Sequence, residues 1–522
     1  MRTECVRSST AVLLLLAILA TTACNDSAAP TPPDTEQTVS LKVEPDRASL
    51  VSGRKISLSA QLFDKSGAPL IVENVSWVSL DPSVATVSPA GEVSANGVGS
   101  TTVVATAGGG KDTATITVLP IGEKPGPSPG EHGGYFVSPS GSSGASGSAS
   151  SPWSLATALS GGNGRVQPGD TIWLRGGTYK GDFNTAISGT ASAPIIVRQY
   201  PGERATINGS LATTGKYTWF WGFEVANADA GSQGTAGVNS LCTGCRFINL
   251  VIHDHSSNGL GMWSEGPDQE AYGNIIYNNG FYGQSADHAA HGIYAQNSAG
   301  AKRLIDNILV NQFGYGVHIY AEESGMWNFI VSGNTAINNG QDTGMDYQVG
   351  GLQPVENLIF TNNMSYRNPS RRDDETARLG YNWGPTNYAA MVIGNYLVGK
   401  LLEFNWSGMT FEDNTILDSS MPTTTRVVVQ PNLYEAGRAN VIVYNWGHQG
   451  AVSVDLSKVL HTGDEYEVRN AQDFYGSPVS SGTYSGGSVS VPITSITTAR
   501  SITGRSTSST GSEFNVYVVM RK

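Results

Sequence analysis

Seven asparagines recur through the middle of the 522-residue chain at intervals of 19 to 33 residues, each within a short apolar segment. They are Asn249, Asn274, Asn307, Asn334, Asn363, Asn395 and Asn414. A glycine series runs out of phase with them: Gly259, Gly292, Gly316, Gly350 and Gly380. This period indicates a solenoid with one coil per repeat, and stacked buried amides can form a hydrogen-bonded ladder along its axis. The repeat therefore predicts a right-handed parallel β-helix over residues 135–432, a fold suited to binding a long polymer.

Composition supports an all-β chain. Glycine contributes 63 residues and charged residues only 14% of the chain, which suits short strands and many turns. The net charge of −12 and the pI near 5.2 exclude nucleic acid as a partner, because phosphate binding needs a basic surface.

The N-terminus has the pattern of an export signal. Arg2 and Arg7 precede an apolar run over residues 11–20, which is too short to span a bilayer, and small residues then lead to Cys24. This ending resembles the lipobox of bacterial lipoproteins, although Thr21 departs from its usual leucine. The resemblance implies a signal over 1–24, a lipid on Cys24 as the sole membrane contact, and a flexible tether over 25–37. The protein is then an outer-membrane or cell-surface lipoprotein; ordinary signal cleavage would leave it secreted instead.

Residues 38–118 form a separate module of alternating strands and turns, as in a β-sandwich. The stretch from Trp77 through the SVATVS strand to Gly97 and Gly99 closely resembles the bacterial Ig-like group-two domain. That resemblance implies a spacer or adhesion module. A Pro- and Gly-rich linker over 119–134 follows.

The next block, from YFVSPSG through SPWSLATALS to APIIVRQYPGERATINGS, resembles the start of secreted β-helix enzymes of the polysaccharide lyase, pectate-lyase type, including family nine. SPWSLATAL is predicted to be a short helix that caps the open end of the solenoid. The resemblance implies a polysaccharide as partner, and an acidic one if the activity is shared.

The asparagine repeat does not continue in residues 433–522. Apolar and polar residues alternate there with period two, as in VSVDL and EYEVRN. They predict a small C-terminal β-sandwich. Packing on the solenoid and capping its C-terminal end is the favoured role, with carbohydrate binding through aromatic residues as the alternative.

Cys242 and Cys245 form a CxxC pair just before the first repeat strand. In an exported β-protein a local disulfide is favoured over free thiols, and a zinc site is disfavoured because structural zinc needs four ligands.

The candidate functional residues lie near one insertion. FYGQSADHAAH lengthens the second coil and carries Asp287, His288 and His291. Insertions in a solenoid gather on one face and often build the binding site. Aligning the glycines puts Tyr294 and His318 in adjacent coils, with Tyr320 on the same face as His318.

These residues suit a lyase, in which a base removes the proton next to a uronate carboxylate and an acid protonates the leaving oxygen. His318 or His291 is the predicted base and Tyr294 or Tyr320 the predicted acid. Other substrate contacts are predicted, and they are Asp287, His288, Lys302, Arg303, Glu322 and Trp263. Lys302, Arg303 or a bound Ca²⁺ would neutralise the carboxylate. The strand column lacks the lysine of family nine, so that family's mechanism cannot be transferred.

Two alternatives remain open. A glycoside hydrolase would need two carboxylates, for which Asp254, Asp287, Glu322 and Glu323 are candidates. A surface glycan-binding protein would need no catalytic group at all. His253 and His255 are interpreted as turn residues, and the charged stretch 371–378 as an internally ion-paired loop. Trp263, Trp327, Trp383 and Trp406 are candidate sugar platforms, although a tryptophan more commonly packs.

Overall fold

The computed structural model describes residues 39–119 (without 45, 52–54, 73 and 98), 134–228, 236–281, 290–381, 386–502 (without 495) and 508–522. The predicted signal, the tether and Cys24 lie outside the described residues, as does most of the predicted linker. Of the helices in the described ranges, none is long and apolar enough to cross a bilayer.

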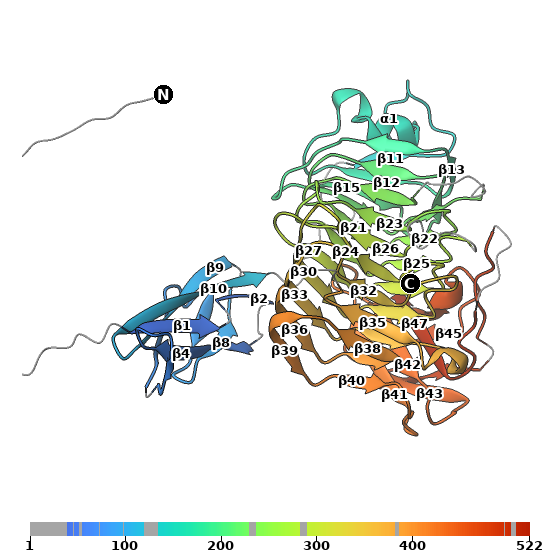
Figure 1. The fold of residues 1–522 in the computed structure, drawn as a ribbon. Coiled ribbons are helices and arrows are strands. Elements are labelled where there is room, and N and C mark those ends of the chain that lie inside the picture. Colours follow the sequence, from blue (N-terminus) through green and yellow to red (C-terminus); the bar gives the residue numbers. More distant parts are fainter. Residues whose placement is uncertain are drawn as a thin grey trace, which may run out of the picture.

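A long parallel solenoid dominates the chain, and each of its coils contributes strands to three sheets (Figure 1). The first sheet contains β11 (Gly134–Val137), β12 (Thr171–Leu174), β15 (Ile195–Gln199), β18 (Thr218–Trp221), β21 (Arg246–Ile248), β24 (Glu270–Tyr272), β27 (Lys302–Ile305), β30 (Met326–Ser332), β33 (Val355–Thr361), β36 (Asn387–Ile393) and β39 (Trp406–Glu412). The second sheet contains β13 (Gly177–Lys180), β16 (Ala205–Asn208), β19 (Glu224–Ala226), β22 (Val251–His253), β25 (Ile275–Tyr277), β28 (Ile308–Val310), β31 (Thr335–Ile337), β34 (Met364–Tyr366), β37 (Tyr396–Val398) and β40 (Thr415–Leu417). The third sheet contains β14 (Phe183–Thr185), β17 (Leu211–Thr213), β20 (Val238–Ser240), β23 (Leu260–Met262), β26 (Ile293–Ala295), β29 (Val317–Ile319), β32 (Tyr347–Val349), β35 (Glu375–Leu379) and β38 (Lys400–Glu403). The predicted all-β class with a parallel β-helix is confirmed.

The N-terminal end of the solenoid is capped as the sequence predicts. Helix α1 (Leu155–Leu159) begins at Ser154, whose Oγ accepts a hydrogen bond from the backbone N–H of Thr157. Leu155, Ala158 and Leu159 join the apolar core that continues through the coils. The cap therefore covers the first coil edge with apolar side chains.

The asparagine ladder is present, with one correction. The ladder begins at Asn274, and from Asn307 to Asn414 each rung accepts at Oδ1 from the side-chain amide of the rung before it, over 2.7–3.2 Å. The predicted first rung is wrong, because the side chain of Asn249 bonds outward to Asn432 and Leu250 occupies the ladder position. Asn249 instead has φ 51°, in the left-handed position that Gly273 holds one coil later. Asparagine tolerates that conformation. The seven aligned asparagines therefore occupy two structural positions: Asn249 lies in a left-handed turn, and the other six form the ladder.

Asn334→Ala is expected to destabilise the solenoid by about 3 kcal/mol, because it leaves the buried amide of Asn307 and the carbonyls of Leu304 and Asn363 short of partners. Urea unfolding followed by circular dichroism measures the change. Asn249→Gly is the matched control, since it keeps the left-handed turn and removes contacts to a single side chain; its expected cost is about 1 kcal/mol. Equal costs at both positions would contradict a stabilising ladder.

A second polar ladder lies between the second and third sheets. Asn279 donates to Gln312 over 3.0 Å, the backbone of Gln312 donates to Asn339 over 3.1 Å, and Asn339 donates to Asp346 over 2.9 Å. This ladder requires a glycine just before the adjacent strand of the third sheet. At Gly316, before β29, a Cβ would lie 2.8 Å from the side-chain amide nitrogen of Asn339. The repeated pair of an asparagine followed by Asn or Gln, as in YNNG, VNQF and INNG, could have predicted this ladder. The predicted glycine series is also corrected. Gly259, Gly292 and Gly316 precede their strands, whereas Gly350 and Gly380 follow theirs.

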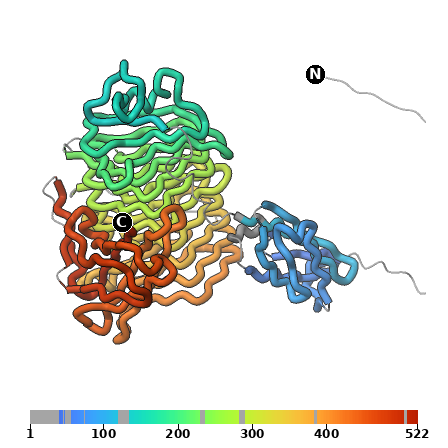
Figure 2. The backbone as a smooth tube through the Cα atoms, turned by 180° about the vertical axis from the view of Figure 1, so that it is seen from behind, coloured from blue at the N-terminus to red at the C-terminus, as the bar shows by residue number. Residues whose placement is uncertain are grey.

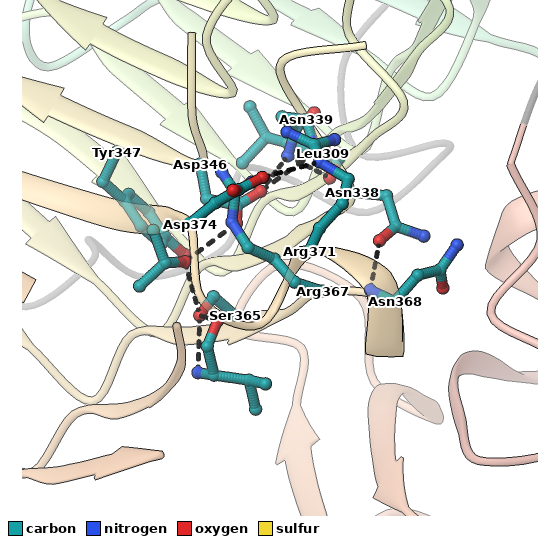
Figure 3. Close-up of polar contacts among 12 residues, drawn as sticks. Leu309, Asn338, Asn339, Asp346, Tyr347, Ser365, Arg367, Asn368, Arg371 and Asp374 are labelled. Atoms are coloured by element: carbon teal, nitrogen blue, oxygen red, sulfur yellow. Dashed lines mark hydrogen bonds and ion pairs between the residues drawn. The ribbon is translucent and has the colours of Figure 1, made fainter. Parts of the chain in front are cut away.

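Asp346 ends this second ladder in a buried ion pair (Figure 3). Its Oδ2 forms an ion pair with Nε of Arg367 at 3.1 Å and accepts a hydrogen bond from the hydroxyl of Thr376 over 2.8 Å. Arg367 and Asp346 are both fully buried. The exposed carboxylate of Asp374 lies 3.7 Å from the same guanidinium, so a second acid faces this cation.

The C-terminal β-sandwich lies along the side of the solenoid in both views (Figures 1 and 2). Its strands are β41 (Arg426–Pro431), β42 (Arg438–Tyr444), β43 (Ala451–Asp455), β44 (Glu465–Asn470), β45 (Ser480–Thr483), β46 (Ser488–Pro492) and β47 (Phe514–Arg521). Ile442 and Tyr444 pack on the outer face of the second sheet, whereas Val441 and Val443 face the sandwich core. The prediction that this module caps the solenoid end is wrong, and its first strand precedes the predicted boundary at 433.

The N-terminal β-sandwich lies beside the first sheet (Figure 2). Its strands are β1 (Ser40–Glu44), β2 (Arg47–Val51), β3 (Lys55–Ser57), β4 (Ser59–Phe63), β5 (Pro69–Leu70), β6 (Ser76–Ser79), β7 (Ala85–Val87), β8 (Glu92–Ala95), β9 (Gly99–Ala107) and β10 (Gly110–Leu119). Its apolar core includes Met391 and packs against Ile393, both from β36. The sandwich is therefore joined to the solenoid by apolar contacts.

Candidate functional site

The third sheet carries an outward column of polar and aromatic side chains. Tyr294 of β26 pairs with His318 of β29, and His318 pairs with Gln348 of β32. Their strand neighbours, such as Val317 and Ile319, are fully buried in the core. The adjacency of Tyr294 and His318 that the glycine alignment predicts is present in the structure.

Four rings form a half-buried row on this face, which we call the aromatic strip: Trp263, Tyr294, His318 and Tyr320. The ring centroids of Trp263 and Tyr294 lie 5.2 Å apart, those of Tyr294 and His318 5.3 Å apart, and those of His318 and Tyr320 5.1 Å apart. Tyr315 stacks on His318 at 4.4 Å. Amphipathic rings in a continuous row suit the apolar faces and hydroxyls of a sugar chain.

Hydrogen bonds fix where the protons of His291 and His318 lie. The backbone N–H of Tyr315 donates to Nδ1 of His291 over 3.1 Å, so the neutral ring carries its proton on Nε2. That nitrogen lies 3.0 Å from Nδ1 of His318 and donates to it. The proton of His318 is therefore on its own Nε2. Both Nδ1 lone pairs are occupied, so the predicted histidine base is corrected: in this arrangement His318 is a hydrogen-bond donor.

Burial keeps this histidine pair neutral. It lowers the pKa of His291 to about 3, and burial together with the neighbouring His291 holds the pKa of His318 well below its ordinary value. Burial also raises the pKa of Tyr294, which therefore keeps its phenolic proton. The strip thus presents neutral donors at ordinary pH.

Acid is expected to destabilise the protein through His291. The folded pKa of about 3 lies below the ordinary value of 6.5, so between these values the unfolded chain binds more protons and stability is lost as pH falls. The loss is about 1.4 kcal/mol per pH unit for each such histidine. Unfolding free energies of wild-type protein and His291→Gln, measured at about pH 6.5 and about pH 4.5, should show a smaller loss in the variant by about 2 kcal/mol. Equal losses would contradict burial of a neutral imidazole.

Two further side chains contact the strip. Nε2 of Gln296 donates to the hydroxyl of Tyr294 over 3.3 Å, and the hydroxyl of Tyr320 donates to Glu322 over 3.3 Å. Glu322 was predicted, whereas Gln296 and the backbone N–H of Tyr315 were missed. Tyr315 could have been found, because it precedes Gly316 as His291 precedes Gly292.

Lys302 and Arg303 belong to β27 of the first sheet, and the expectation that they neutralise a bound carboxylate is corrected. Lys302 points inward and is fully buried, and its Nζ donates to the carbonyls of Met262, Trp263 and Gln296 over 2.5–3.1 Å. Burial lowers the pKa of this ammonium to about 7. Lys302 therefore supports the turns that carry Trp263 and Gln296. Arg303 pairs in register with Glu270, away from the third sheet.

Asp287 and His288 lie outside the described residues. Among the residues the structure does describe, no group of three or more His, Cys, Asp or Glu side chains could hold a metal ion. Ca²⁺ binding stays an untested prediction.

His253 and His255 are buried, away from the strip. His253 lies between Glu224 and Asp254, each at 2.8 Å, and Ser501 of the C-terminal sandwich donates to Asp254. These groups fix the sandwich to the second sheet. Asp254 is fully buried and is therefore removed as a hydrolase candidate.

A groove of about 470 Å³ extends the strip toward the later coils. It is lined by Tyr315, Thr343, Gly344, Met345, Asp373, Asp374, Glu375, Arg378 and Lys400. Arg378 forms an ion pair with Glu375, and Arg371 forms one with Asp374, as the charged stretch predicted. Both cations of the groove, Arg378 and Lys400, were missed as site residues.

The CxxC pair and the aromatic residues of the C-terminal sandwich serve structure. Cys242 and Cys245 are joined in a disulfide and are fully buried. The tryptophan and tyrosine residues of the C-terminal sandwich are buried or half-buried, including Trp446 and Tyr434. Packing therefore accounts for them better than sugar binding does.

Comparison with known proteins agrees with this architecture. Residues 135–371 match the family described as Pel9A-like, right handed beta helix region, and residues 38–118 match the bacterial Ig-like domain (group 2). Pectate lyase L of Dickeya dadantii (strain 3937) is 25% identical over 58% of this chain and 76% of its own length. Pectate lyase PEL9 of Emericella nidulans is 44% identical, over only 14% of this chain and 18% of its own length.

Solved structures resemble the solenoid loosely. The crystal structure of pectate lyase Pel9A gives a TM-score of 0.39 at 19% identity, covering 54% of this chain and 79% of that one. A rhamnogalacturonan lyase gives 0.35 at 14% identity, covering 54% and 84%. The family matches thus show a region similar to a bacterial group-two Ig-like domain, followed by a region similar to a Pel9A-like right-handed β-helix.

Proposed function

We propose that this exported protein binds an acidic polysaccharide along the third sheet and cleaves it by β-elimination. One observation carries the proposal: the hydrogen bonds from Tyr315 to His291 to His318 orient a neutral donor between two phenols. β-Elimination needs such a donor at the uronate carboxylate, with a proton acceptor and a proton donor beside it.

The proposed roles follow from these positions. Nε2–H of His318 donates to the carboxylate and stabilises the charge that develops there. Tyr320 takes up the proton next to the carboxylate while it passes its own proton to Glu322, 3.3 Å away. Tyr294, whose pKa burial raises, protonates the leaving oxygen. Arg378 and Lys400 in the adjoining groove are placed to bind further carboxylates of the polymer.

The direct test is to follow the near-ultraviolet absorbance of the unsaturated product. Mature protein is incubated with polygalacturonate, methyl-esterified pectin, alginate and glycosaminoglycans, each with and without Ca²⁺. Absorbance is expected to rise with at least one of them, and Tyr294→Phe and Tyr320→Phe are expected to slow the rise. Tyr200→Phe is the control, because Tyr200 is an exposed tyrosine that follows β15 of the first sheet. New reducing ends without absorbance would show hydrolysis and overturn β-elimination.

A non-catalytic glycan-binding protein is the second candidate. It is favoured by the occupied Nδ1 atoms of His291 and His318, which leave neither imidazole as a proton acceptor. Retention on an acidic polysaccharide, with neither absorbance nor reducing ends, would establish this alternative.

We also propose that Cys24 is lipidated, because an apolar run and then small residues precede it. Labelled palmitate should enter the wild-type protein and not Cys24→Ala. Equal labelling would overturn the proposal.

A further inference from the structure

The outer edge of the first sheet carries a second exposed aromatic column, away from the aromatic strip. Trp327 of β30 pairs with Glu356 of β33, and Glu356 pairs with Tyr388 of β36. Trp327 is 39% exposed and Tyr388 is 49% exposed. Two strand spacings separate the rings by about 10 Å, which is close to the span of a disaccharide.

A bulge repeated in successive coils shapes this edge. The residues after the column have left-handed backbones in each coil, with φ 55° at Asn328, 57° at Asn357, 53° at Ala389 and 76° at Gly408. They are left out of the strand pairing, so the flanking residues turn away from the regular sheet. Alanine in this conformation costs about 1–2 kcal/mol. Retained strain of this kind clusters at binding sites.

Glu356 and Tyr388 of the column line a cleft of about 720 Å³ between the first sheet and the N-terminal sandwich, and Trp327 continues the column beyond the cleft lining. Glu356, Asn357 and Tyr388 line one wall, and Lys42 and Asp112 line the other. The apolar contacts of Met391 with the sandwich core hold the two walls together. The cleft therefore combines an exposed ring with polar groups from two modules.

Charge decides which sugars suit this cleft. Among the described residues that line it, Lys42 is the one cation, and it is paired with Glu44. The carboxylates of Glu44, Asp46, Asp112 and Glu356 face the same space. Such a surface repels a polyuronate, whereas carboxylates and amides readily accept hydrogen bonds from hydroxyls.

We propose that this cleft is a second glycan-binding site that holds an uncharged polysaccharide strand, separate from the strip on the third sheet. Tyr388 and Trp327 stack on its sugar rings, and Glu356, Asn357 and Asp112 accept bonds from its hydroxyls. The Ig-like domain is then one wall of a binding site, beyond its role as a spacer.

The test is affinity electrophoresis of the full mature chain in gels that contain galactan, xylan or mixed-linkage β-glucan. At least one uncharged polysaccharide is expected to retard the wild-type protein, and Tyr388→Ala and Trp327→Ala are each expected to weaken that binding at least tenfold. Phe411→Ala is the matched control, because Phe411 is 43% exposed on the same sheet but belongs neither to the cleft lining nor to the column of Trp327, Glu356 and Tyr388.

His318→Ala separates this site from the proposed active site. It should leave retardation by the uncharged polysaccharide unchanged. No retardation by any of the three glycans would overturn the second site, as would equal losses in Tyr388→Ala and Phe411→Ala. Loss of the retardation in His318→Ala would assign the binding to the third sheet and also overturn it.

Discussion

Replacing His318 with alanine is expected to lower kcat of the proposed β-elimination by about 10²–10³-fold, the usual cost of removing one positioned donor. The change in the free energy of unfolding should stay below about 1 kcal/mol, because the side chain is half-buried and water can satisfy the Nε2–H of His291. Product absorbance gives kcat, and urea unfolding gives stability.

His318→Gln distinguishes a donor from a base at this position. An amide oxygen can accept from His291 while the amide nitrogen donates to the substrate, so partial activity should return. Such rescue would not occur if His318 removed a proton, since an amide is not a base. An inactive His318→Gln with native stability would therefore contradict the donor role.

Replacing Arg367 with alanine is expected to destabilise the solenoid by about 3–5 kcal/mol, because it leaves the fully buried carboxylate of Asp346 without its cation. The double variant Asp346→Asn with Arg367→Met should recover most of this loss, since a neutral pair of similar volume removes the unpaired charge. Urea unfolding of the wild-type protein and of the single and double variants gives the free energies of a double-mutant cycle.

Arg371→Ala is the control in the same loop. Arg371 pairs with the exposed carboxylate of Asp374 over 3.2 Å, and such surface pairs contribute about 0–1 kcal/mol. A loss in Arg367→Ala no larger than that of Arg371→Ala would contradict the buried pair.

Much of the fold could be predicted because a solenoid repeats its structural demands in sequence. The asparagine period predicts the ladder, and the glycines before the strands predict the contact between Tyr294 and His318. The error at Asn249 arises because a left-handed turn accepts Gly, Asn or Asp, so the residue before each rung can imitate the rung.

Other features depend on contacts that the repeat does not encode. The proton positions on His291 and His318 follow from the backbone N–H of Tyr315, which composition does not reveal. The inward direction of Lys302 follows from its register with Phe329. The sequence did contain a signal for the docking of the C-terminal sandwich. In β25, Ile275 and Tyr277 point outward while Ile276 enters the solenoid core, so both faces of the strand are apolar. A strand that is apolar on both faces predicts a cover.

The C-terminal sandwich, which covers the second sheet, also affects how the solenoid unfolds. A plain solenoid frays from its ends, because each coil contacts only its neighbours. Here the hairpin that carries Tyr434 packs on Trp219 and Tyr272, while Trp446 bonds to Tyr396 near the other end. The sandwich acts as a strap across most of the coils, and its central strand β47 follows all of the coils in the chain. The coils can thus form in order along the chain and be locked together only when β47 joins the sandwich.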